Sequence, residues 1–415
     1  MKPYVIIGNG TAAASCIEGI RSVDKERPIT VVSAESHPVY CRPLISYYLE
    51  GKTDLQRIGY RGDDFYSANG CTVLFGKKAV GISPQRKEIT LDDGLVIEYK
   101  KLCVATGSSP FVPPMEGLDL VKSKQTFMTL DDALLLEQSL STESRVLIVG
   151  AGLIGLKCAE GILARVKSVT VCDLAPRVLS SILDDVCAAK IQKHLEAQGI
   201  RFLLADTAVR FEENKAVMKS GVEVEFDRLI LAVGVRANTA LVKDCGGKTE
   251  RGILINERME TSLSDIYAAG DCAQGFDISA EQSRVLAILP NANLQGRCAG
   301  VNMAGGSAVF DNAIPMNAIG FFGLHALSAG CDRSGEEGGA VYEEADETHL
   351  KRLFTKDGIL TGFMLIGETV RAGIYTSLIR NRTPLDSLDF DRLKQTPTTA
   401  AFSASARKQF FGGAV

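Results

Sequence analysis

Short apolar runs that lead into glycine and then into a helical pattern recur along this chain. The clearest stands at the start, where the run Tyr4–Ile7 meets Gly8-Asn9-Gly10 and a stretch of small residues that begins at Thr11. Apolar runs of this length, bounded by turn signals, are typical of buried strands. We predict a strand over Tyr4–Ile7, a helix from Thr11 to about Arg21, and a second strand over Ile29–Ser33.

The same order of elements returns in the middle of the chain. The apolar run Val146–Val149 leads into Gly150-Ala151-Gly152 and a helix that we expect to end near Ala164. A strand is predicted to follow over Ser168–Cys172. Strands that alternate with helices favour parallel sheets. The pattern therefore predicts an α/β protein with two related strand–turn–helix–strand motifs.

The glycines of both turns have the spacing found in dinucleotide-binding folds. In the first turn Gly8 permits the tight turn and Gly10 lets a pyrophosphate approach the backbone, while Ala13 stands in place of a third glycine. The second turn is complete, with Gly150, Gly152 and Gly155. The N–H groups at each helix start would face the phosphates. Two such turns suggest one flavin nucleotide and one nicotinamide nucleotide.

The remaining stretches give weaker signals. Residues 60 to 100 alternate around the turn signal Asp92-Asp93-Gly94 and predict a small antiparallel excursion. Prolines at positions 110, 113 and 114 indicate a linker. Later we predict strands over Lys351–Phe354 and Leu360–Ile366 and a helix over Val370–Arg380. The end of the chain, rich in Ala, Ser and Gly, is expected to be poorly ordered.

Composition excludes several classes of function. A chain of 415 residues favours two or three domains, and its net charge of −4 lacks the basic footprint of a nucleic-acid partner. No apolar run could cross a membrane, and the first strand starts almost at Met1, so we expect a cytoplasmic protein without a signal peptide. The 11 cysteines contain no Cys-x-x-Cys pair, which favours reduced thiols and indicates no metal site.

A segment after the second strand resembles a known family. Pro38 to Ser46 is similar to the Pro-Tyr-x-Arg-Pro-x-Leu-Ser segment of the two-dinucleotide flavoprotein reductases, the pyridine nucleotide-disulfide oxidoreductase superfamily. Three later segments also match its motifs, and the resemblance extends over about residues 1 to 390; those segments are Leu102–Pro110, Val233–Asn238 and Ile266–Cys272. The similarity is greatest to NADH:rubredoxin reductases and to the flavin module of nitrite reductases.

The resemblance implies a fold and a domain plan. We expect an α/β protein with two Rossmann-like domains of the glutathione-reductase type and an α+β C-terminal interface domain. The FAD-binding domain would be discontinuous, over residues 1–111 and 239–316, with an NAD(P)H-binding domain over 112–238. Residues 317–415 would form the interface domain, which makes a homodimer plausible.

The resemblance also assigns residues to the two cofactors. Those assigned to FAD are Gly8, Gly10, Thr11, Ala12, Glu35, Arg42, Pro43, Ala105, Thr106, Gly107, Gly270, Asp271 and Asn291. Those assigned to the nicotinamide nucleotide are Gly150, Gly152, Leu153, Ile154, Gly155, Asp173 and Gly234.

Three charged residues have positions that bear on ribose and phosphate recognition. Glu35 and Asp173 each end the second strand of a motif, where an acid can bind ribose hydroxyls. A solvated surface carboxylate is the alternative for Glu35. Asp173 favours NADH over NADPH, although Arg177, four residues on, could meet a 2′-phosphate instead.

Two positions depart from the family pattern. Relatives usually carry Lys after the Leu-Ser pair and Glu two residues after the third glycine of the NAD motif, and these often pair beside the flavin. Here the residues are Tyr47 and Lys157. We predict a rearranged pair, in which the cation has moved to the helix that follows the NAD glycine turn and has no acidic partner. Alternatively, Lys157 reaches solvent and Tyr47 only packs.

Cys41 decides between two functional hypotheses. The first is an FAD-dependent NAD(P)H:acceptor oxidoreductase, in which hydride passes from NADH to FAD and electrons pass to a rubredoxin, a ferredoxin or a small-molecule acceptor. The second is an NADH oxidase, peroxidase or coenzyme A-disulfide reductase with Cys41 as redox thiol. The thiol enzymes of the family carry Cys followed by Gly, whereas Arg42 follows Cys41 here, which favours a packed or half-buried thiol. A regulatory flavoprotein without turnover is a third alternative. The candidate catalytic residues are thus Lys157, Tyr47 and Cys41.

Overall fold

The computed structural model describes residues 1–405 and residue 407. The chain folds into two compact units. The large unit comprises Met1–Gly275 and Leu289–Phe310, and the small unit comprises Phe276–Ile288 and the chain from Asp311 onward. The prediction for the end of the chain falls largely outside the described residues.

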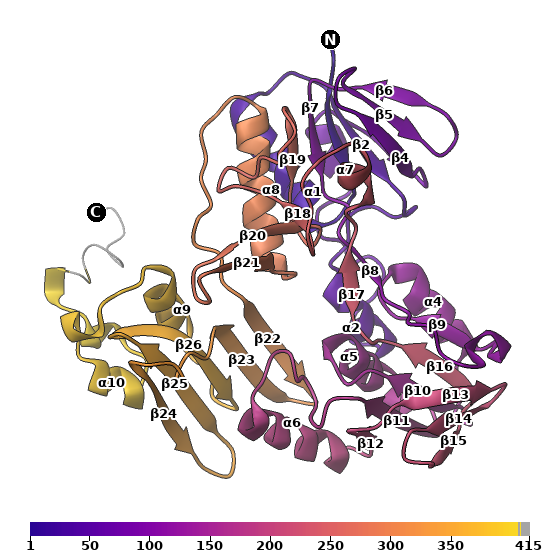
Figure 1. Cartoon of the computed structure of the whole chain (residues 1–415), viewed down its shortest axis with the longest axis vertical. Coiled ribbons are helices and arrows are strands. Elements are labelled where there is room, and N and C mark those ends of the chain that lie inside the picture. Colours follow the sequence, from indigo (N-terminus) through magenta and orange to yellow (C-terminus); the bar gives the residue numbers. More distant parts are fainter. Residues whose placement is uncertain (406, 408–415) are drawn as a thin grey trace. The chain divides into compact units, whose positions relative to one another are not determined.

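The large unit contains two parallel sheets (Figure 1). We call the first sheet, together with the elements that pack on its two faces, the N-terminal module. Its strand order is β19-β7-β1-β2-β3, and every neighbouring pair is parallel. The strands are β1 (Tyr4–Ile7), β2 (Ile29–Ser33), β3 (Cys71–Phe75), β7 (Lys101–Val104) and β19 (Ile266–Ala268). The two strands predicted from the first motif are confirmed residue for residue.

Both faces of this sheet are covered. Tyr4 and Ile6 of β1 face the helices α1 (Thr11–Val23) and α8 (Leu289–Met303). Val5 and Ile7 face the antiparallel sheet formed by β4 (Ala79–Ser83), β5 (Glu88–Leu91) and β6 (Val96–Glu98). This sheet is the excursion predicted for residues 60 to 100. Burial on both sides explains why β1 is apolar throughout.

Glycines bring α1 and α8 into close contact, and the two helices lie side by side in Figure 1. A Cβ atom on Gly296 would overlap the carbonyl oxygen of Ala12, and one on Gly300 would overlap that of Cys16. The two backbones are therefore closer than any other residue type would allow. This contact holds α1, which follows the first glycine turn, against the sheet.

The second parallel sheet, with its helices, forms the central module of the large unit. Its strand order is β12-β11-β10-β16-β9, again parallel throughout. The strands are β9 (Lys124–Thr126), β10 (Arg145–Val149), β11 (Ser168–Asp173), β12 (Arg201–Leu204) and β16 (Arg228–Leu231), and the helices are α4 (Leu130–Ser139), α5 (Leu153–Ile162) and α6 (Asp185–Ala197). A small antiparallel sheet is added by β13 (Ala208–Glu212), β14 (Lys215–Met218) and β15 (Glu223–Glu225).

Two crossing segments join the modules as an antiparallel ribbon. β8 (Ser108–Pro110) leaves the N-terminal module and pairs with β17 (Val235–Ala237), which returns to it. Asn238 links the two strands of the ribbon through its side chain. It donates to the carbonyl oxygen of Thr106 at 2.8 Å and accepts from the hydroxyl of Ser109 at 2.8 Å.

The small unit is built on an antiparallel sheet of order β22-β23-β26-β25-β24. The strands are β22 (Met316–Phe321), β23 (Leu324–Gly330), β24 (Gly339–Ala345), β25 (Leu350–Lys356) and β26 (Ile359–Ile366), and the helices are α9 (Gly373–Arg380) and α10 (Phe390–Gln395). The helix predicted to start at Val370 starts three residues later, because Arg371 has a φ of +62° and cannot continue a right-handed helix.

The remaining elements are short. They are α2 (Ile45–Leu49), α3 (Phe65–Ala68), α7 (Ala240–Asp244), β18 (Ile253–Leu254), β20 (Ala273–Asp277), β21 (Gln282–Val285) and single 3₁₀ turns at Arg42–Leu44, Leu118–Leu120, Leu163–Arg165, Leu385–Ser387 and Thr399–Ala401. The predicted α/β class with two dinucleotide-type sheets is confirmed, whereas the exact domain boundaries stay predictions.

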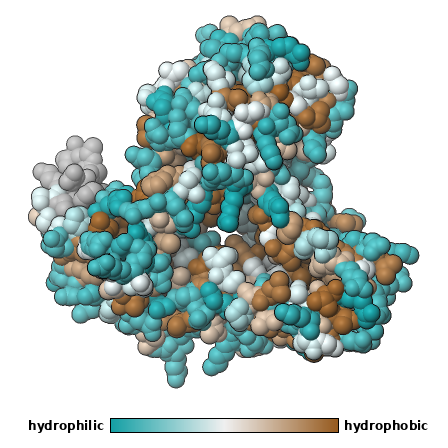
Figure 2. Space-filling model, in the orientation of Figure 1, coloured by the Kyte–Doolittle hydropathy of each residue, from teal (hydrophilic) through white to brown (hydrophobic). Residues whose placement is uncertain are grey.

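Among the described residues, no helix has both the length and the apolar character needed to span a membrane. On the face shown in Figure 2, hydrophobic residues form small patches separated by hydrophilic ones.

The α1–α8 contact generates a stability prediction. Gly300→Ala places a methyl group against the backbone of Cys16 and Ile20 and should lower the free energy of unfolding by about 1–3 kcal/mol. The control is Gly373→Ala at the start of α9, where no atom of the described residues lies within 4 Å of the new Cβ. Urea unfolding measures both variants. Equal stability of Gly300→Ala and the parent protein would contradict the close contact.

Candidate functional site

Backbone conformation and packing require glycine at two positions of the nucleotide-type turns. Gly8 and Gly150 have φ values of +114° and +117°, which strain any other residue. A Cβ atom on Gly8 would also overlap the carbonyl oxygen of Ala105, and one on Gly150 would overlap that of Ala232. These glycines therefore form the turns and need no ligand to explain them.

Gly10 and Gly152 differ, because nothing in the protein requires them to be glycine. Their φ values are −95° and −78°, and no atom of the described residues lies within 4 Å of a Cβ built on either. Each lines open space beside a helix start. A pyrophosphate lying against the backbone would use that space. The turns thus fit the predicted dinucleotides.

The helices behind these turns also leave their first N–H groups available. Gly10 and Gly152 are the N-cap residues of α1 and α5, and neither helix has a side-chain cap or an acidic residue in its first turn. By contrast, Thr129 caps α4 and Asp184 caps α6. Uncapped N–H groups and the helix dipole attract anions. Thr11, Ala12, Leu153 and Ile154 lie in these two first turns, as predicted.

Sheet topology brings most of the predicted FAD residues to one edge. Gly8 follows β1, Glu35 follows β2, Ala105 follows β7, and Gly270 and Asp271 follow β19. The carboxyl ends of parallel strands meet at the same edge of a sheet, where nucleotides bind. Thr106 and Gly107 continue from Ala105, Pro43 follows Arg42 in a 3₁₀ turn, and Asn291 is buried in the first turn of α8.

Asp271 is a partly buried carboxyl group at this edge. Burial raises the pKa of Asp271 above its ordinary value, while the Ser108 hydroxyl and the charge of Arg42 oppose the rise. Ser108 Oγ lies 3.4 Å from Asp271 Oδ2. Gly270 has a φ of +81°, and its N–H donates to Gln295 Oε1 of α8 at 2.8 Å. The turn that presents Asp271 is therefore held by α8.

Glu35 and Arg42 contact each other. Arg42 Nη2 lies 2.6 Å from Glu35 Oε1, and the hydroxyl of Tyr40 donates to Glu35 Oε2 at 2.6 Å. Burial acts to lower the pKa of Arg42, but Tyr40 and the carboxylates of Glu35 and Asp271 raise it above its ordinary value. Arg42 is therefore placed where both acids act on it. The predicted phosphate role of Arg42 stays a prediction.

The predicted nicotinamide-nucleotide residues gather at the matching edge of the central module. Gly150 follows β10, Asp173 ends β11, and Gly234 follows β16 with a φ of +120°. Asp173 Oδ2 accepts the N–H of Ala151 at 2.6 Å, and Oδ1 accepts that of Ala175 at 2.8 Å. The acid is thus fixed beside the glycine turn. Gly155 packs its Cα against the backbone of Gly150.

Arg177, four residues after Asp173, has partners within the protein. It pairs with Asp185 at the start of α6, with Nη1 and Oδ1 2.7 Å apart, and donates to the carbonyl oxygens of Ser180 and Leu183. To receive a 2′-phosphate, the guanidinium would have to give up its pair with Asp185.

Tyr47 and Lys157 meet where α2 packs against α5. Lys157 Nζ lies 4.5 Å from the centroid of the Tyr47 ring. Close packing of the helices brings the two together, since a Cβ on Gly161 of α5 would lie 2.8 Å from the carbonyl oxygen of Ser46 in α2. The prediction that these two positions act as a pair is therefore matched by direct contact.

The prediction that Lys157 lacks an acidic partner is wrong. Lys157 Nζ forms an ion pair with Glu160, one turn further along α5, and the side chains are 14% and 3% exposed. The alternative in which Lys157 extends into solvent is also excluded by this burial. The family places an acid at the position that Lys157 occupies here, whereas in this chain the acid is Glu160, three residues on, and this spacing on a helix is the signal that identifies it.

Cys41 is a half-buried thiol. Burial raises the pKa of Cys41 above its ordinary value, only partly opposed by the N–H of Leu44. Redox-active cysteines require a lowered pKa. The placement of Cys41 therefore favours a packed thiol.

Other polar residues position the site although the sequence had not indicated them. Asn9, between the first two glycines, accepts from the hydroxyl of Tyr66 at 2.8 Å, and that hydroxyl accepts the N–H of Val39 at 2.9 Å. These bonds tie the glycine turn to the segment that carries Arg42. They join residues far apart in sequence, so no local pattern could reveal them.

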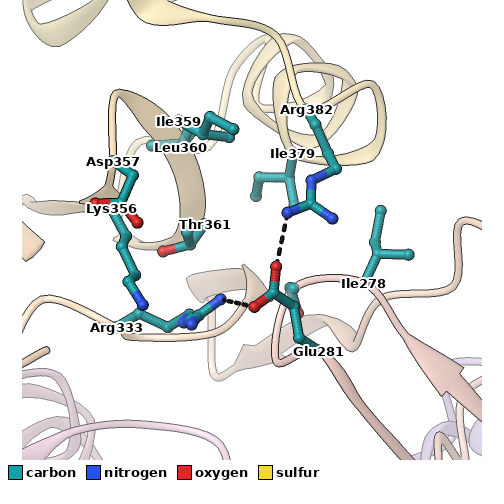
Figure 3. A pocket seen from close by; sticks show the side chains of 11 residues that line it. Ile278, Glu281, Arg333, Lys356, Asp357, Ile359, Leu360, Thr361, Ile379 and Arg382 are labelled. Carbon is teal, nitrogen blue, oxygen red and sulfur yellow. Dashed lines mark hydrogen bonds and ion pairs between the residues drawn. The ribbon is translucent and has the colours of Figure 1, made fainter. Parts of the chain in front are cut away.

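A small pocket in the small unit carries none of the predicted motifs (Figure 3). Arg333 and Arg382 lie on its wall and both pair with Glu281, at 3.0 and 2.7 Å. Because the pocket holds none of the predicted site residues and these three charges pair with one another, we do not take it as the candidate site. In the described part of the chain, no cluster of three or more His, Cys, Asp or Glu side chains could hold a metal ion.

Comparison with known proteins identifies this arrangement. The family model described as pyridine nucleotide-disulphide oxidoreductase matches residues 2–296. The epsilon subunit of NADH-dependent phenylglyoxylate dehydrogenase from Aromatoleum evansii is 35% identical over 396 residues, which are 93% of either chain. An NADH oxidase from Methanocaldococcus jannaschii is 32% identical over 390 residues, 88% of this chain and 87% of that one.

The fold also matches solved structures. A chain of the covalent putidaredoxin reductase–putidaredoxin complex superposes with a TM-score of 0.88 at 22% identity, covering 96% of this chain and 97% of that one. The resemblance read from the segment around Arg42 is confirmed.

The two open glycines generate a paired prediction. Gly10→Ala should fold normally but lose flavin, because the new methyl group fills the space beside α1, and affinity should fall about tenfold or more. Gly152→Ala should keep its flavin and instead raise the KM for nicotinamide nucleotide. Absorbance at the flavin band, circular dichroism and steady-state kinetics separate the two effects. Unchanged nucleotide affinities in both variants would contradict the assignment of the two spaces.

Proposed function

The chain belongs to the pyridine nucleotide-disulphide oxidoreductase family, and within it we propose that this protein is an FAD-dependent NADH:acceptor oxidoreductase. It is a flavoprotein oxidoreductase that uses a pyridine nucleotide. One observation carries the proposal: a single unit contains two uncapped helix starts, each behind a glycine turn that leaves space beside it. One turn would hold FAD and the other NADH.

We assign FAD to the N-terminal module. Its edge presents two acids, Glu35 and Asp271, on either side of the glycine turn, with Arg42 near both. A dinucleotide with sugar hydroxyls at both ends and a pyrophosphate between them matches acids at the ends and a cation in the middle. Bound flavin would supply the hydride-accepting chemistry.

NADH is the proposed donor for the central module. Asp173 lies beside the glycine turn, where a carboxylate accepts from a 2′-hydroxyl and repels a 2′-phosphate. Arg177, the cation that could have reversed this preference, is paired with Asp185. Both observations support NADH.

The role of the chain's own residues is to bind and orient. The glycine turns hold the two pyrophosphates, and the ribbon of β8 and β17 fixes the modules to each other through Asn238. Tyr47, Lys157 and Glu160 form a contact between α2, in the segment that follows β2, and α5 of the central module. We propose that this contact helps to set the position of the nicotinamide nucleotide relative to the flavin.

A small electron-transfer protein is the proposed acceptor. The Aromatoleum relative is named as a subunit of a larger dehydrogenase, and the putidaredoxin reductase fold is known in a covalent complex with putidaredoxin. Both support transfer to a protein. The raised pKa of Cys41 speaks against the thiol-based alternative. Rubredoxin and ferredoxin are the acceptors to test first.

The proposal is tested by anaerobic titration. One equivalent of NADH should bleach the flavin band, and the reduced protein should then pass electrons to rubredoxin or ferredoxin faster than to a disulfide. Cys41→Ser should keep its activity with these acceptors within about twofold, because the thiol is packed and not reactive. Absence of bleaching would support the regulatory alternative, and loss of activity in Cys41→Ser would support the thiol enzyme.

Asp173 gives a second test, on cofactor choice. Asp173→Asn removes the charge that repels a phosphate and keeps an acceptor oxygen for one of the two N–H groups, of Ala151 and Ala175, that the carboxylate receives. The ratio of kcat/KM for NADPH to that for NADH should rise about tenfold or more. Asp185→Asn is the control, since it releases Arg177 without altering Asp173. A larger change in the control than in Asp173→Asn would show that Arg177, and not the acid, sets the preference.

A further inference from the structure

Tyr40 is the buried centre of the hydrogen-bond network around Glu35. Its side chain is 9% exposed, and burial raises the pKa of its phenol well above the ordinary value, so the hydroxyl keeps its proton. That hydroxyl donates to Glu35 Oε2 at 2.6 Å. The guanidinium of Arg42 lies over the Tyr40 ring, 5.2 Å from its centroid, and Arg42 Nη2 contacts Glu35 Oε1.

The two donors leave Glu35 suited to bind a diol. A carboxylate has about four lone-pair positions, two on each oxygen. Tyr40 occupies one position on Oε2 and Arg42 one on Oε1. One position therefore remains on each oxygen, and the side chain is 28% exposed. Two adjacent hydroxyl groups of a ribose could donate to both oxygens at once.

The same two residues reach the central module. The hydroxyl of Tyr40 accepts the N–H of Leu130 at 3.0 Å, and Arg42 Nη1 donates to the carbonyl oxygen of Met128 at 2.8 Å. Met128 lies in the segment that joins β9 to α4, and Leu130 is the first residue of α4. Glu35 is therefore connected, through one side chain on each oxygen, to the backbone of the other module.

The segment that receives these bonds is itself rigid. Asp132 Oδ2 accepts the N–H groups of Met128 and Thr129 at 2.8 and 3.0 Å, and the Thr129 hydroxyl accepts the N–H of Asp132 at 3.0 Å. This capping box fixes the start of α4. A change in the direction of Tyr40 or Arg42 would therefore be transmitted to α4 and not absorbed by the segment.

We propose that Tyr40 is a positioning residue that orients Glu35 toward the adenosine ribose of FAD and links occupancy of that site to the start of α4. The inference rests on the proposed assignment of FAD to the N-terminal module. It goes beyond that assignment because it names the residue that orients the ribose acid and the backbone segment that responds to the ribose.

Tyr40→Phe tests the proposal, with Tyr48→Phe as a matched control. Tyr48 also donates its hydroxyl to a glutamate, Glu137, but that glutamate lies on α4, away from the glycine turn. The apoprotein of each variant is titrated with FAD and with FMN, which lacks the adenosine half. Tyr40→Phe should raise the Kd for FAD about tenfold and leave that for FMN within about twofold. Tyr48→Phe should change neither by more than about twofold.

Hydrogen exchange at the backbone N–H of Leu130 tests the link to α4. FAD should slow this exchange in the parent protein, and the response should be absent in Tyr40→Phe. FMN should leave the exchange unchanged in both proteins. Glu35→Gln, which keeps the shape of the acid, provides a second variant if Tyr40→Phe folds poorly, and it should also weaken FAD and not FMN.

The outcomes distinguish failure of the proposed function from failure of the role of Tyr40. A parent protein that binds neither flavin overturns the proposed function. If the parent binds FAD, an unchanged Kd in Tyr40→Phe, or equal weakening of FAD and FMN, overturns the role of Tyr40. A Leu130 exchange rate that FAD does not alter in the parent overturns the link to α4.

Discussion

The uncapped starts of α1 and α5 are the constraint on which the rest of this structure depends. A helix leaves its first N–H groups without partners, and most helices satisfy them with a capping side chain. Here α4 and α6 are capped, whereas α1 and α5 begin at Gly10 and Gly152 without a side-chain cap. Several short helices also lack a side-chain cap, but α1 and α5 are the ones that begin behind a glycine turn at the carboxyl edge of a parallel sheet. The way these two helices begin suits them to bind anions.

Close backbone packing serves to hold these helix starts in place. Gly8 and Gly150 press against the carbonyl groups of Ala105 and Ala232, and Gly300 presses against the backbone of α1. Each contact excludes a side chain, so the strands and helices around the turns have little freedom to shift. Gly10 and Gly152 make no such contact. The glycines thus fall into two physical classes, those that the fold requires and those that leave room for a ligand.

Local sequence predicted the elements that depend on local causes. Apolar runs beside glycines gave β1 and β2 at their observed bounds, because burial on both faces produces an unmistakable pattern. It could not give the start of α9, which depends on the left-handed backbone of Arg371. Nor could it give the network of Tyr40, whose bond to Leu130 spans 90 residues. The glycines of the candidate site were predicted from spacing, and its acids from spacing and from resemblance to family motifs, whereas the residues that orient them were not predicted.

The buried contact of Tyr47, Lys157 and Glu160 changes how the departure from the family pattern should be understood. An isolated ammonium group with 14% exposure would be costly, and it would act on a bound flavin as a positive charge. Paired with Glu160, Lys157 instead contributes a dipole whose effect falls more steeply with distance. The ring of Tyr47 attracts the ammonium without adding charge. The exchanged residues therefore preserve an attraction between α2 and α5 while leaving the net charge at the contact close to zero. Their main effect should be on how closely α2 packs against α5. A cation that had lost its partner would instead act mainly on the electrostatics of reduced flavin.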